Sequence, residues 1–227
     1  MKNAMKKILI NKNMPPEMRA SLNEFQIITS CAKKGIENSL ALHPDMQFFC
    51  HGDFKICDKN LHSYYKNFFE DIKASTFSGT SYPTYIGLNG LVFKDKFIHN
   101  LKYTDPLILD YMKEKHIDLI HVNQGYSKCN VLACEDVLIT SDKMIYEKTK
   151  GFCHALLIRP GGIRLKDFPY GFIGGASGVI NNKIYFTGVF EDEDIKEQVL
   201  SFLDRHGKEY VFLSKLPLED FGSILEI

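Results

Sequence analysis

Residues 171–188 read GFIGGASGVINNKIYFTG, and this stretch decides the fold. Its glycine cluster carries Ser177 and opens a short strand, and Asn181-Asn182 form a turn that leads into a second, apolar strand. The following residues predict a helix over 192–206 and then one more strand. One hairpin–helix–strand unit therefore occupies about forty residues.

Weaker copies of this unit recur along the chain. Their inner strands are predicted to begin at five positions that lie 36, 40, 48 and 46 residues apart, namely Asp53, Asn89, Cys129, Ser177 and Ser223. Hairpins between the helices favour a ring of repeats over a generic α/β layer fold, which alternates helices with single strands. The last unit ends after its first strand. We therefore expect a strand over 6–10 to complete that unit and close the ring.

Two further predictions depend on local patterns. Apolar residues between 61 and 72 follow the i, i+3, i+4, i+7 spacing that is typical of an amphipathic helix. Residues 124–134 are interpreted as the start of an inner strand that contains Cys129, and residues 51–53 as an interruption in the strand that ends at Cys57.

Composition bounds the class of protein. The chain has 227 residues, 44% hydrophobic and 25% charged, which predicts one globular domain over 1–227. Lys+Arg and Asp+Glu number 28 each, so no excess of basic charge favours nucleic acid or an anionic membrane. The apolar run near the N-terminus covers only Ile8–Ile10, and no stretch approaches the ~18 residues that span a bilayer. We expect a cytoplasmic protein.

The six cysteines are too sparse for a disulfide scaffold, and we expect them to be reduced thiols. They form no Cys-x-x-Cys pair, so the usual zinc spacing is missing. The nearest cluster, Cys50 and His51 with Cys57, is interpreted as a strand with partly buried thiols. No metal and no cofactor are predicted.

Three motifs carry a resemblance to a known fold: GYSKC at 125–129, the hairpin from Phe172 to Gly188, and the terminal LPLEDFGS at 216–223. With them the chain resembles the pentein fold, a five-bladed α/β propeller of guanidino-group-modifying enzymes. Arginine and agmatine deiminases, dimethylarginine hydrolase and a non-enzymatic ribosomal anti-association factor share that fold. The resemblance is strongest over 124–227 and is closest to an uncharacterised bacterial branch of the fold.

The resemblance implies a nucleophilic cysteine, a histidine base and carboxylates that bind a guanidinium. His51, Asp53 and Cys129 stand at or beside predicted inner strand starts and are the candidate catalytic residues. Two departures put the full set in doubt. The nucleophile of the family lies in its last repeat, where this chain has Ser223, and the acidic residue after the paired glycines is replaced by Ala176.

The candidate ligand-binding residues are polar side chains near the expected pore or on a glycine-rich loop, namely Asn89, Asn130, Ser177, Arg159, Arg164 and Asp220. A loop arginine is suited to a carboxylate or phosphate, although a solvated loop is the plainer interpretation. Asp220 is either a ligand or a turn residue.

Two functions stay open at this point. One is a diverged, non-catalytic propeller that binds a small polar ligand in its pore, and the missing cysteine and acid favour it. The other is a thiol-dependent hydrolase or amidinotransferase that acts on a guanidino or amidine compound. The sequence predicts no nucleic-acid or membrane partner and gives no oligomeric state.

Overall fold

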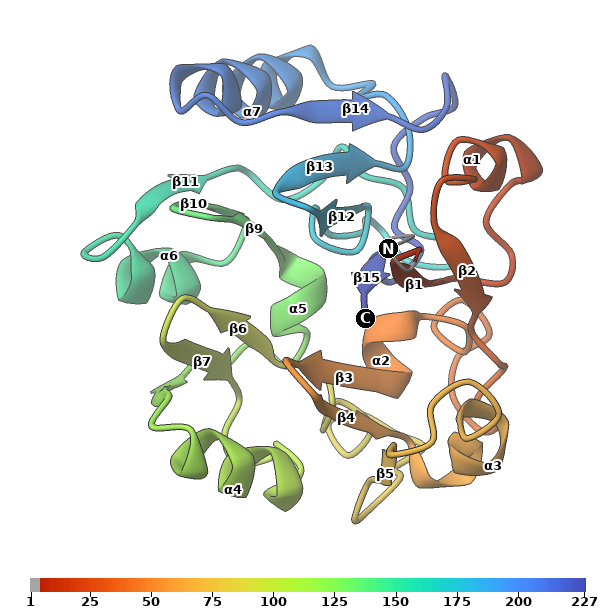
Figure 1. Cartoon of the computed structure of the whole chain (residues 1–227). Helices are drawn as coiled ribbons and strands as arrows, with labels where there is room; N and C mark the ends of the chain where they lie inside the picture. Colours follow the sequence, from red (N-terminus) through yellow and green to blue (C-terminus); the bar gives the residue numbers. More distant parts are fainter. Residues whose placement is uncertain (1–4) are drawn as a thin grey trace.

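The computed structural model describes residues 5–227 as a ring of five three-stranded sheets around a central axis (Figure 1). The strand orders are β15-β1-β2, β3-β4-β5, β6-β7-β8, β9-β10-β11 and β12-β13-β14. Every sheet pairs its inner strand antiparallel to the middle strand, and the middle strand parallel to the outer one. The five sheets are therefore copies of one unit, and the predicted five-bladed α/β propeller is confirmed.

The inner strands are β3 (Phe48–His51), β6 (Leu91–Phe93), β9 (Val131–Cys134), β12 (Ser177–Ile180) and β15 (Leu225–Glu226). The middle strands are β1 (Lys7–Ile10), β4 (Phe54–Cys57), β7 (Lys96–His99), β10 (Val137–Thr140) and β13 (Lys183–Phe186). The outer strands are β2 (Gln26–Thr29), β5 (Lys73–Ala74), β8 (Asp118–His121), β11 (His154–Leu157) and β14 (Tyr210–Phe212).

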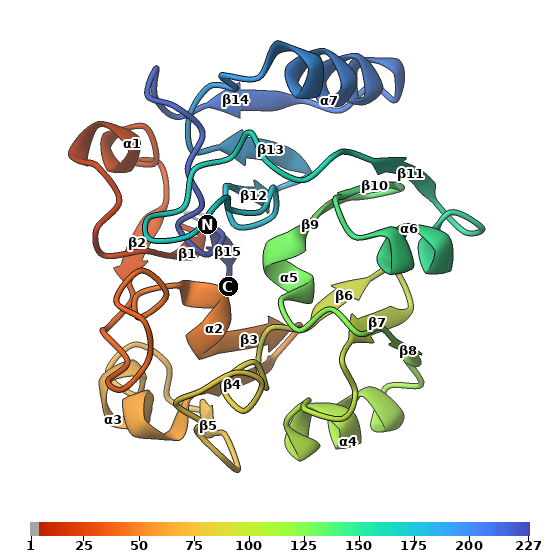
Figure 2. The same cartoon turned by 180° about the vertical axis from the view of Figure 1, so that it is seen from behind.

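The helices have two kinds of position. Those between middle and outer strands are α1 (Pro16–Ala20), η1 (Lys59–Leu61) with α3 (His62–Tyr65), α4 (Pro106–Glu114), α6 (Lys143–Thr149) and α7 (Glu193–Arg205). Two short helices, α2 (Pro44–Gln47) and α5 (Ser127–Asn130), instead precede inner strands and lie close to the axis in both views (Figures 1 and 2). No helix between residues 5 and 227 has the length and apolarity to cross a membrane.

The ring closes as expected. β1 pairs antiparallel with β15, with Ile8 opposite Glu226 and Leu9 opposite Leu225. β1 and β15, the first and last strands of the described chain, thus complete one blade and lie side by side near the axis (Figure 1). Neighbouring blades share apolar cores: Val199 of α7 and Phe186 of β13 pack in the same buried cluster as Leu132 of β9. Burial between the blades therefore holds the ring together.

The predicted helix over 61–72 is wrong in extent, since α3 ends at Tyr65. The side-chain amide of Asn67 donates hydrogen bonds of 3.1 Å to the carbonyl oxygens of Ser63 and Tyr64. It thereby competes for acceptors that a continuing helix would use. The apolar residues of this segment still reach the core, among them Phe69 and Ile72.

The interpretation of residues 51–53 as an interruption within one strand is also wrong. β3 and β4 form a hairpin in which His51 pairs with Phe54. Gly52 has a φ of +53°, the left-handed conformation that favours glycine in tight turns. Residues 51–53 are therefore the tip of a blade hairpin and do not begin an inner strand.

Candidate functional site

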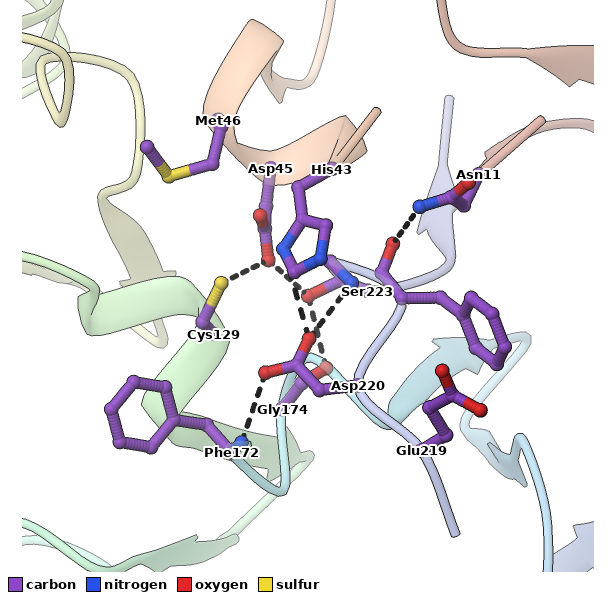
Figure 3. Close-up of polar contacts among 12 residues, drawn as sticks. Asn11, His43, Asp45, Met46, Cys129, Phe172, Gly174, Glu219, Asp220 and Ser223 are labelled. Carbon is purple, nitrogen blue, oxygen red and sulfur yellow. Dashed lines mark hydrogen bonds and ion pairs between the residues drawn. The ribbon is translucent and has the colours of Figure 1, made fainter. Parts of the chain in front are cut away.

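The candidate site lies where the chain enters the inner strands (Figure 3). Asp45 is on α2, and His43 is the residue that precedes this helix, with Pro44 at its first turn. Cys129 is on α5, so the prediction that it lies in a strand is wrong. Asp220 and Ser223 belong to the segment that leads to β15. The repeats thus bring side chains from distant parts of the chain to one point.

Asp45 is the centre of the hydrogen-bond network. Its Oδ2 accepts hydrogen bonds from Cys129 Sγ at 2.8 Å and from Ser223 Oγ at 2.7 Å (Figure 3). Its Oδ1 is buried and has no hydrogen-bond partner within the described chain. Burial raises the pKa of Asp45, because a charge is poorly solvated there.

Asn89 fixes α5 against α2. Its Oδ1 accepts hydrogen bonds from the backbone N–H groups of Lys128 and Cys129, at 3.0 and 3.3 Å. Its amide nitrogen donates to the carbonyl oxygen of Asp45 at 3.1 Å and lies 3.4 Å from Cys129 Sγ. A fully buried amide with these partners holds the thiol beside the carboxylate.

Asp220 is held by the backbone. Its Oδ2 accepts from the N–H of Phe172 and its Oδ1 from the N–H of Gly222, both at 2.9 Å. Burial raises its pKa to about 7. His43 Nδ1 lies 3.8 Å from Asp220 Oδ1, and burial lowers the pKa of His43, which favours the neutral imidazole.

The glycine pair of the opening stretch makes room for this network. A Cβ at Gly175 would lie 2.0 Å from Asp220 Oδ1, so only glycine leaves space for that carboxylate. The carbonyl oxygen of Gly174 lies 2.9 Å from Ser223 Oγ, as a second acceptor within reach of its one proton. The cluster therefore serves the site through its backbone, by allowing close approach to neighbouring segments.

A cavity of about 220 Å³ opens onto this network. Its polar wall consists of His43, Cys129 and Asp220. The remaining lining residues are apolar or aromatic: Leu40, Tyr126, Leu165, Phe168, Pro169, Tyr170 and Phe172. Few polar groups on a mainly apolar wall are typical of a small-molecule site.

The thiol of Cys129 is protonated at neutral pH. Burial is the first cause that raises its pKa well above the usual value, and the nearby carboxylates of Asp45 and Asp220 add to it. Because Cys129 Sγ donates to Asp45, a thiolate forms there only after the carboxylate or another group accepts the proton.

The predicted catalytic trio is not assembled. Asp53 is exposed at the β3–β4 turn. His51, at the far end of β3, has its Nδ1 3.1 Å from the Tyr111 hydroxyl, and burial lowers its pKa. A four-residue strand spans ~10 Å, so the far end of β3 lies well away from Asp45 and Cys129.

The predicted ligand-binding residues divide between several places. Asn89 and Asp220 lie in the network with Cys129. Ser177 lines a second cavity of about 400 Å³, which residues of all five inner strands surround and which also contains His51. Asn130 turns instead toward Thr140 and Ser141, where its side chain is hydrogen-bonded within its own blade.

The side chains of both loop arginines are exposed on the surface. Arg159 is paired with Asp192, and Arg164 makes two hydrogen bonds of 2.8 Å to Glu191. Each guanidinium is exposed and already has a carboxylate partner. Both arginines therefore lie on an exposed loop apart from the residues of the pore, and their binding of a carboxylate or phosphate stays a prediction.

His43 and Asp45 are the functional candidates that sequence reasoning missed. The signal was the repeat period itself. Measured from Asp53 the first interval is 36 residues, the shortest of the four, whereas from Asp45 to Asn89 it is 44. If the first repeat is taken to begin at Asp45, the residues His43-Pro44-Asp45 are placed at the axis of the ring.

Comparison with known proteins gives the fold and the family. A family model described as "Family of unknown function (DUF6873)" matches residues 9–225. No curated protein sequence matches the chain.

Solved structures match over nearly the whole chain at low identity. DDAH from Pseudomonas aeruginosa, as a cysteine-to-serine mutant complexed with citrulline, is 8% identical with a TM-score of 0.62, over 98% of this chain and 99% of that one. A dimethylarginine dimethylaminohydrolase adduct with S-methyl-L-thiocitrulline is 9% identical with a TM-score of 0.60, over 98% and 100%. An amidinotransferase of the saxitoxin pathway from Microseira wollei is 10% identical with a TM-score of 0.53, over 99% and 94%.

At these identities the likeness concerns the fold alone, and it agrees with the five copies of one blade described above. The chain therefore has the pentein fold and belongs to the family of unknown function DUF6873.

Proposed function

We propose that this protein binds a small ligand with a planar cationic group, such as a guanidinium or amidinium, in the 220 Å³ cavity. The observation that carries the proposal is the buried Asp220 carboxylate on the cavity wall. Between residues 5 and 227 it has no lysine or arginine partner within ion-pair distance. A buried carboxylate favours an incoming cation, because the ion pair offsets the loss of hydration.

The hydrogen-bond geometry supports a planar donor. Each oxygen of Asp220 accepts one backbone N–H and keeps a further lone pair for a ligand. A planar guanidinium or amidinium can donate one N–H to each oxygen at the same time, whereas a compact cation such as an ammonium group cannot match both oxygens in this way. Tyr126 and Phe172 also line the cavity, and aromatic rings attract cations.

The volume limits the ligand. The cavity of about 220 Å³ is below the ~300–1,000 Å³ that is usual for drug-sized ligands. A single guanidino or amidino group with a short apolar chain suits this volume and the apolar remainder of the wall.

The first prediction compares methylguanidine with methylurea, which has nearly the same shape but no charge. We expect methylguanidine to raise the Tm of chelator-treated protein at neutral pH, by the equivalent of about 2.7 kcal/mol at a hundred times its Kd. Methylurea should have no comparable effect. The gain should weaken as the pH falls through about 7, because Asp220 then takes up a proton. Differential scanning fluorimetry measures each shift.

The variant Asp220→Asn tests whether the carboxylate of Asp220 binds the ligand. Glu219→Gln is its control, because Glu219 is the neighbouring residue in the chain and lies outside this cavity. The stabilisation should disappear in the first variant and persist in the second. Equal stabilisation by methylurea, or full stabilisation of a folded Asp220→Asn protein, would show that charge recognition by Asp220 is not what binds the ligand.

A second candidate function is thiol-dependent cleavage or transfer of an amidino group. The observation that favours it is that Cys129 lines the same cavity, with Asp45 Oδ2 placed to accept its proton. In such a reaction the thiolate attacks the amidine carbon, and the C–N bond to the leaving amine breaks as that amine takes up a proton. The covalent amidino-thiol adduct is then passed to water or to another amine.

The second prediction separates the two functions. We expect chloroacetamidine at neutral pH to alkylate Cys129 no faster than Cys50 or Cys134, because the raised pKa of Cys129 keeps the nucleophilic thiolate scarce. Burial also raises the pKa of Cys50 and Cys134, to about 11, which makes them matched references. Peptide mass spectrometry over time gives the rates. Rapid, stoichiometric and selective labelling of Cys129 would instead favour the enzyme.

A further inference from the structure

Three ligand types that suit a transition metal meet in the centre of the ring. A ring nitrogen of His43, a carboxylate oxygen of Asp45 and Cys129 Sγ all lie within 4.8 Å of one another, and all three residues are buried. They come from the start of α2 and from α5, which are separated by two blades in sequence. This set stands beside the cation-binding wall described above and does not depend on its function.

Two atoms of the set have no partner. Five buried side-chain atoms of the described chain lack a hydrogen bond, and two of them, His43 Nδ1 and Asp45 Oδ1, belong to this cluster. Buried polar atoms are nearly always paired, so two orphans on adjoining ligands indicate a partner that the protein itself does not supply. A cation is such a partner, because nitrogen and carboxylate lone pairs are both acceptors.

We propose that His43, Asp45 and Cys129 bind a zinc ion, with a fourth position open to the 220 Å³ cavity. Imidazole, thiolate and carboxylate are the ligands that zinc takes in proteins, whereas Mg²⁺ and Ca²⁺ prefer oxygen alone. Three protein ligands with one free position are typical of zinc sites that bind exchangeable molecules. His43 and Cys129 line the cavity and give that position access to it.

The surrounding hydrogen bonds match what such a site needs. Ser223 Oγ donates to Asp45 Oδ2, and Asn89 Nδ2 lies 3.4 Å from Cys129 Sγ, so two donors orient two of the ligands. Outer partners of this kind fix the geometry of metal ligands. Neutral His43 has a ring lone pair to offer, which a protonated imidazole lacks.

Binding has a defined proton balance. The Cys129 thiol donates its proton to Asp45 Oδ2, and this proton leaves when the thiolate and the carboxylate bind zinc. One bond from sulfur to hydrogen breaks, one from sulfur to zinc forms, and about one proton per ion passes to the buffer. Affinity should therefore rise with pH.

Cobalt is the probe, because Co²⁺ replaces zinc and reports a thiolate ligand by a near-ultraviolet charge-transfer band. Titrating chelator-treated, reduced protein with Co²⁺ should produce this band with one equivalent bound, and Zn²⁺ should then remove it. Cys129→Ser should lose the band, and His43→Ala should weaken Co²⁺ binding at least tenfold. Calorimetry with Zn²⁺ in buffers of different ionisation enthalpy should give about one proton released.

Cys50→Ser and Cys134→Ser are the matched controls. Cys50 stands beside His51 in the other cavity, and Cys134 lies in the same blade as Cys129 but outside the cluster. Both variants should keep the band and the affinity. The proposal fails if folded wild-type protein gives no band, if folded Cys129→Ser retains it, or if Cys50→Ser loses it.

The measurements on wild-type protein also decide the case where Cys129→Ser does not fold. Two results would then overturn the assignment. One is zinc binding without proton release, and the other is a His43→Ala protein that binds Co²⁺ with the affinity of the wild type. These titrations contain no organic cation, and the methylguanidine test uses protein from which a chelator has removed metal. Either proposal can therefore fail without the other.

Discussion

Replacing Gly174 by alanine is expected to destabilise the protein severely. A Cβ at this position would lie 2.3 Å from the carbonyl oxygen of Val131, 2.4 Å from that of Lys128 and 2.7 Å from that of Cys129. All three obstacles are backbone atoms of α5 and β9, so no side chain can rotate away. Overpacking a core costs ~1–3 kcal/mol and occasionally more. Because all three close contacts are with backbone oxygens, we expect the upper end of that range or an unfolded chain, measured by urea unfolding.

Gly151→Ala is the matched control. Gly151 follows α6, has no positive φ, and a Cβ there would meet nothing within 4 Å. Its substitution should change the free energy of unfolding by less than about 1 kcal/mol, and alanine restricts the unfolded chain more than glycine does. If Gly174→Ala and Gly151→Ala unfold at the same urea concentration, the close approach of blades at Gly174 is not a constraint on the fold.

Local signals made most of the architecture predictable. Asp105, Asp142 and Asp192 each accept a hydrogen bond from a backbone N–H in the first turn of α4, α6 and α7. Such caps mark where a helix begins, and the helix predicted over 192–206 differs from α7 by one residue at each end. Asn181 and Asn182 have φ of +53° and +61°, which the two-residue hairpin turn requires.

The site could not be predicted in the same way, because long-range contacts assemble it. Asp45 meets Cys129 across 84 positions and Ser223 across 178. Its two supporting helices, α2 and α5, have only four residues each, which is too short for an apolar period to appear. Only the repeat spacing linked these positions, and it was misaligned in the first blade.

That misalignment moved the candidate acid by eight positions, from Asp45 to Asp53. The hairpin turn at His51–Asp53 was interpreted as a break within one strand, and the strand start was set at the wrong end of β3. Because a pore position recurs once in each blade, one wrong start exchanged a buried carboxylate for an exposed one. The later blades, set at Asn89 and Cys129, were aligned correctly with the network.

Asp45→Asn is expected to stabilise the protein when metal and ligand are absent, and to abolish zinc binding. Asparagine keeps an oxygen that can accept from Cys129 and Ser223, and it places an uncharged amide where Asp45 Oδ1 has no partner. At pH values above the raised pKa of Asp45, where the carboxylate is ionised, removing this poorly compensated buried charge should raise the free energy of unfolding by about 1–3 kcal/mol. Such a gain at the expense of binding is usual for residues that serve a site.

The dependence on pH follows from the sign of the shift. Burial raises the pKa of Asp45 in the folded protein above its value in the unfolded chain. Between those two values the folded state holds more protons, so wild-type stability falls as the pH rises. Asp220, with a pKa of about 7, adds the same trend, and Asp45→Asn should remove only the part that belongs to Asp45.

Urea unfolding of both proteins between about pH 4 and pH 8 measures this. The advantage of Asp45→Asn should be small at acid pH, where Asp45 is itself protonated, and should grow as the pH rises through the raised pKa of Asp45. Asp53→Asn, at the exposed tip of the β3–β4 hairpin, is the control and should leave both stability and cobalt binding unchanged. If Asp45→Asn is less stable than wild type throughout this range, the charge of Asp45 is compensated in the free protein. The two unpartnered atoms would then no longer indicate a missing cation.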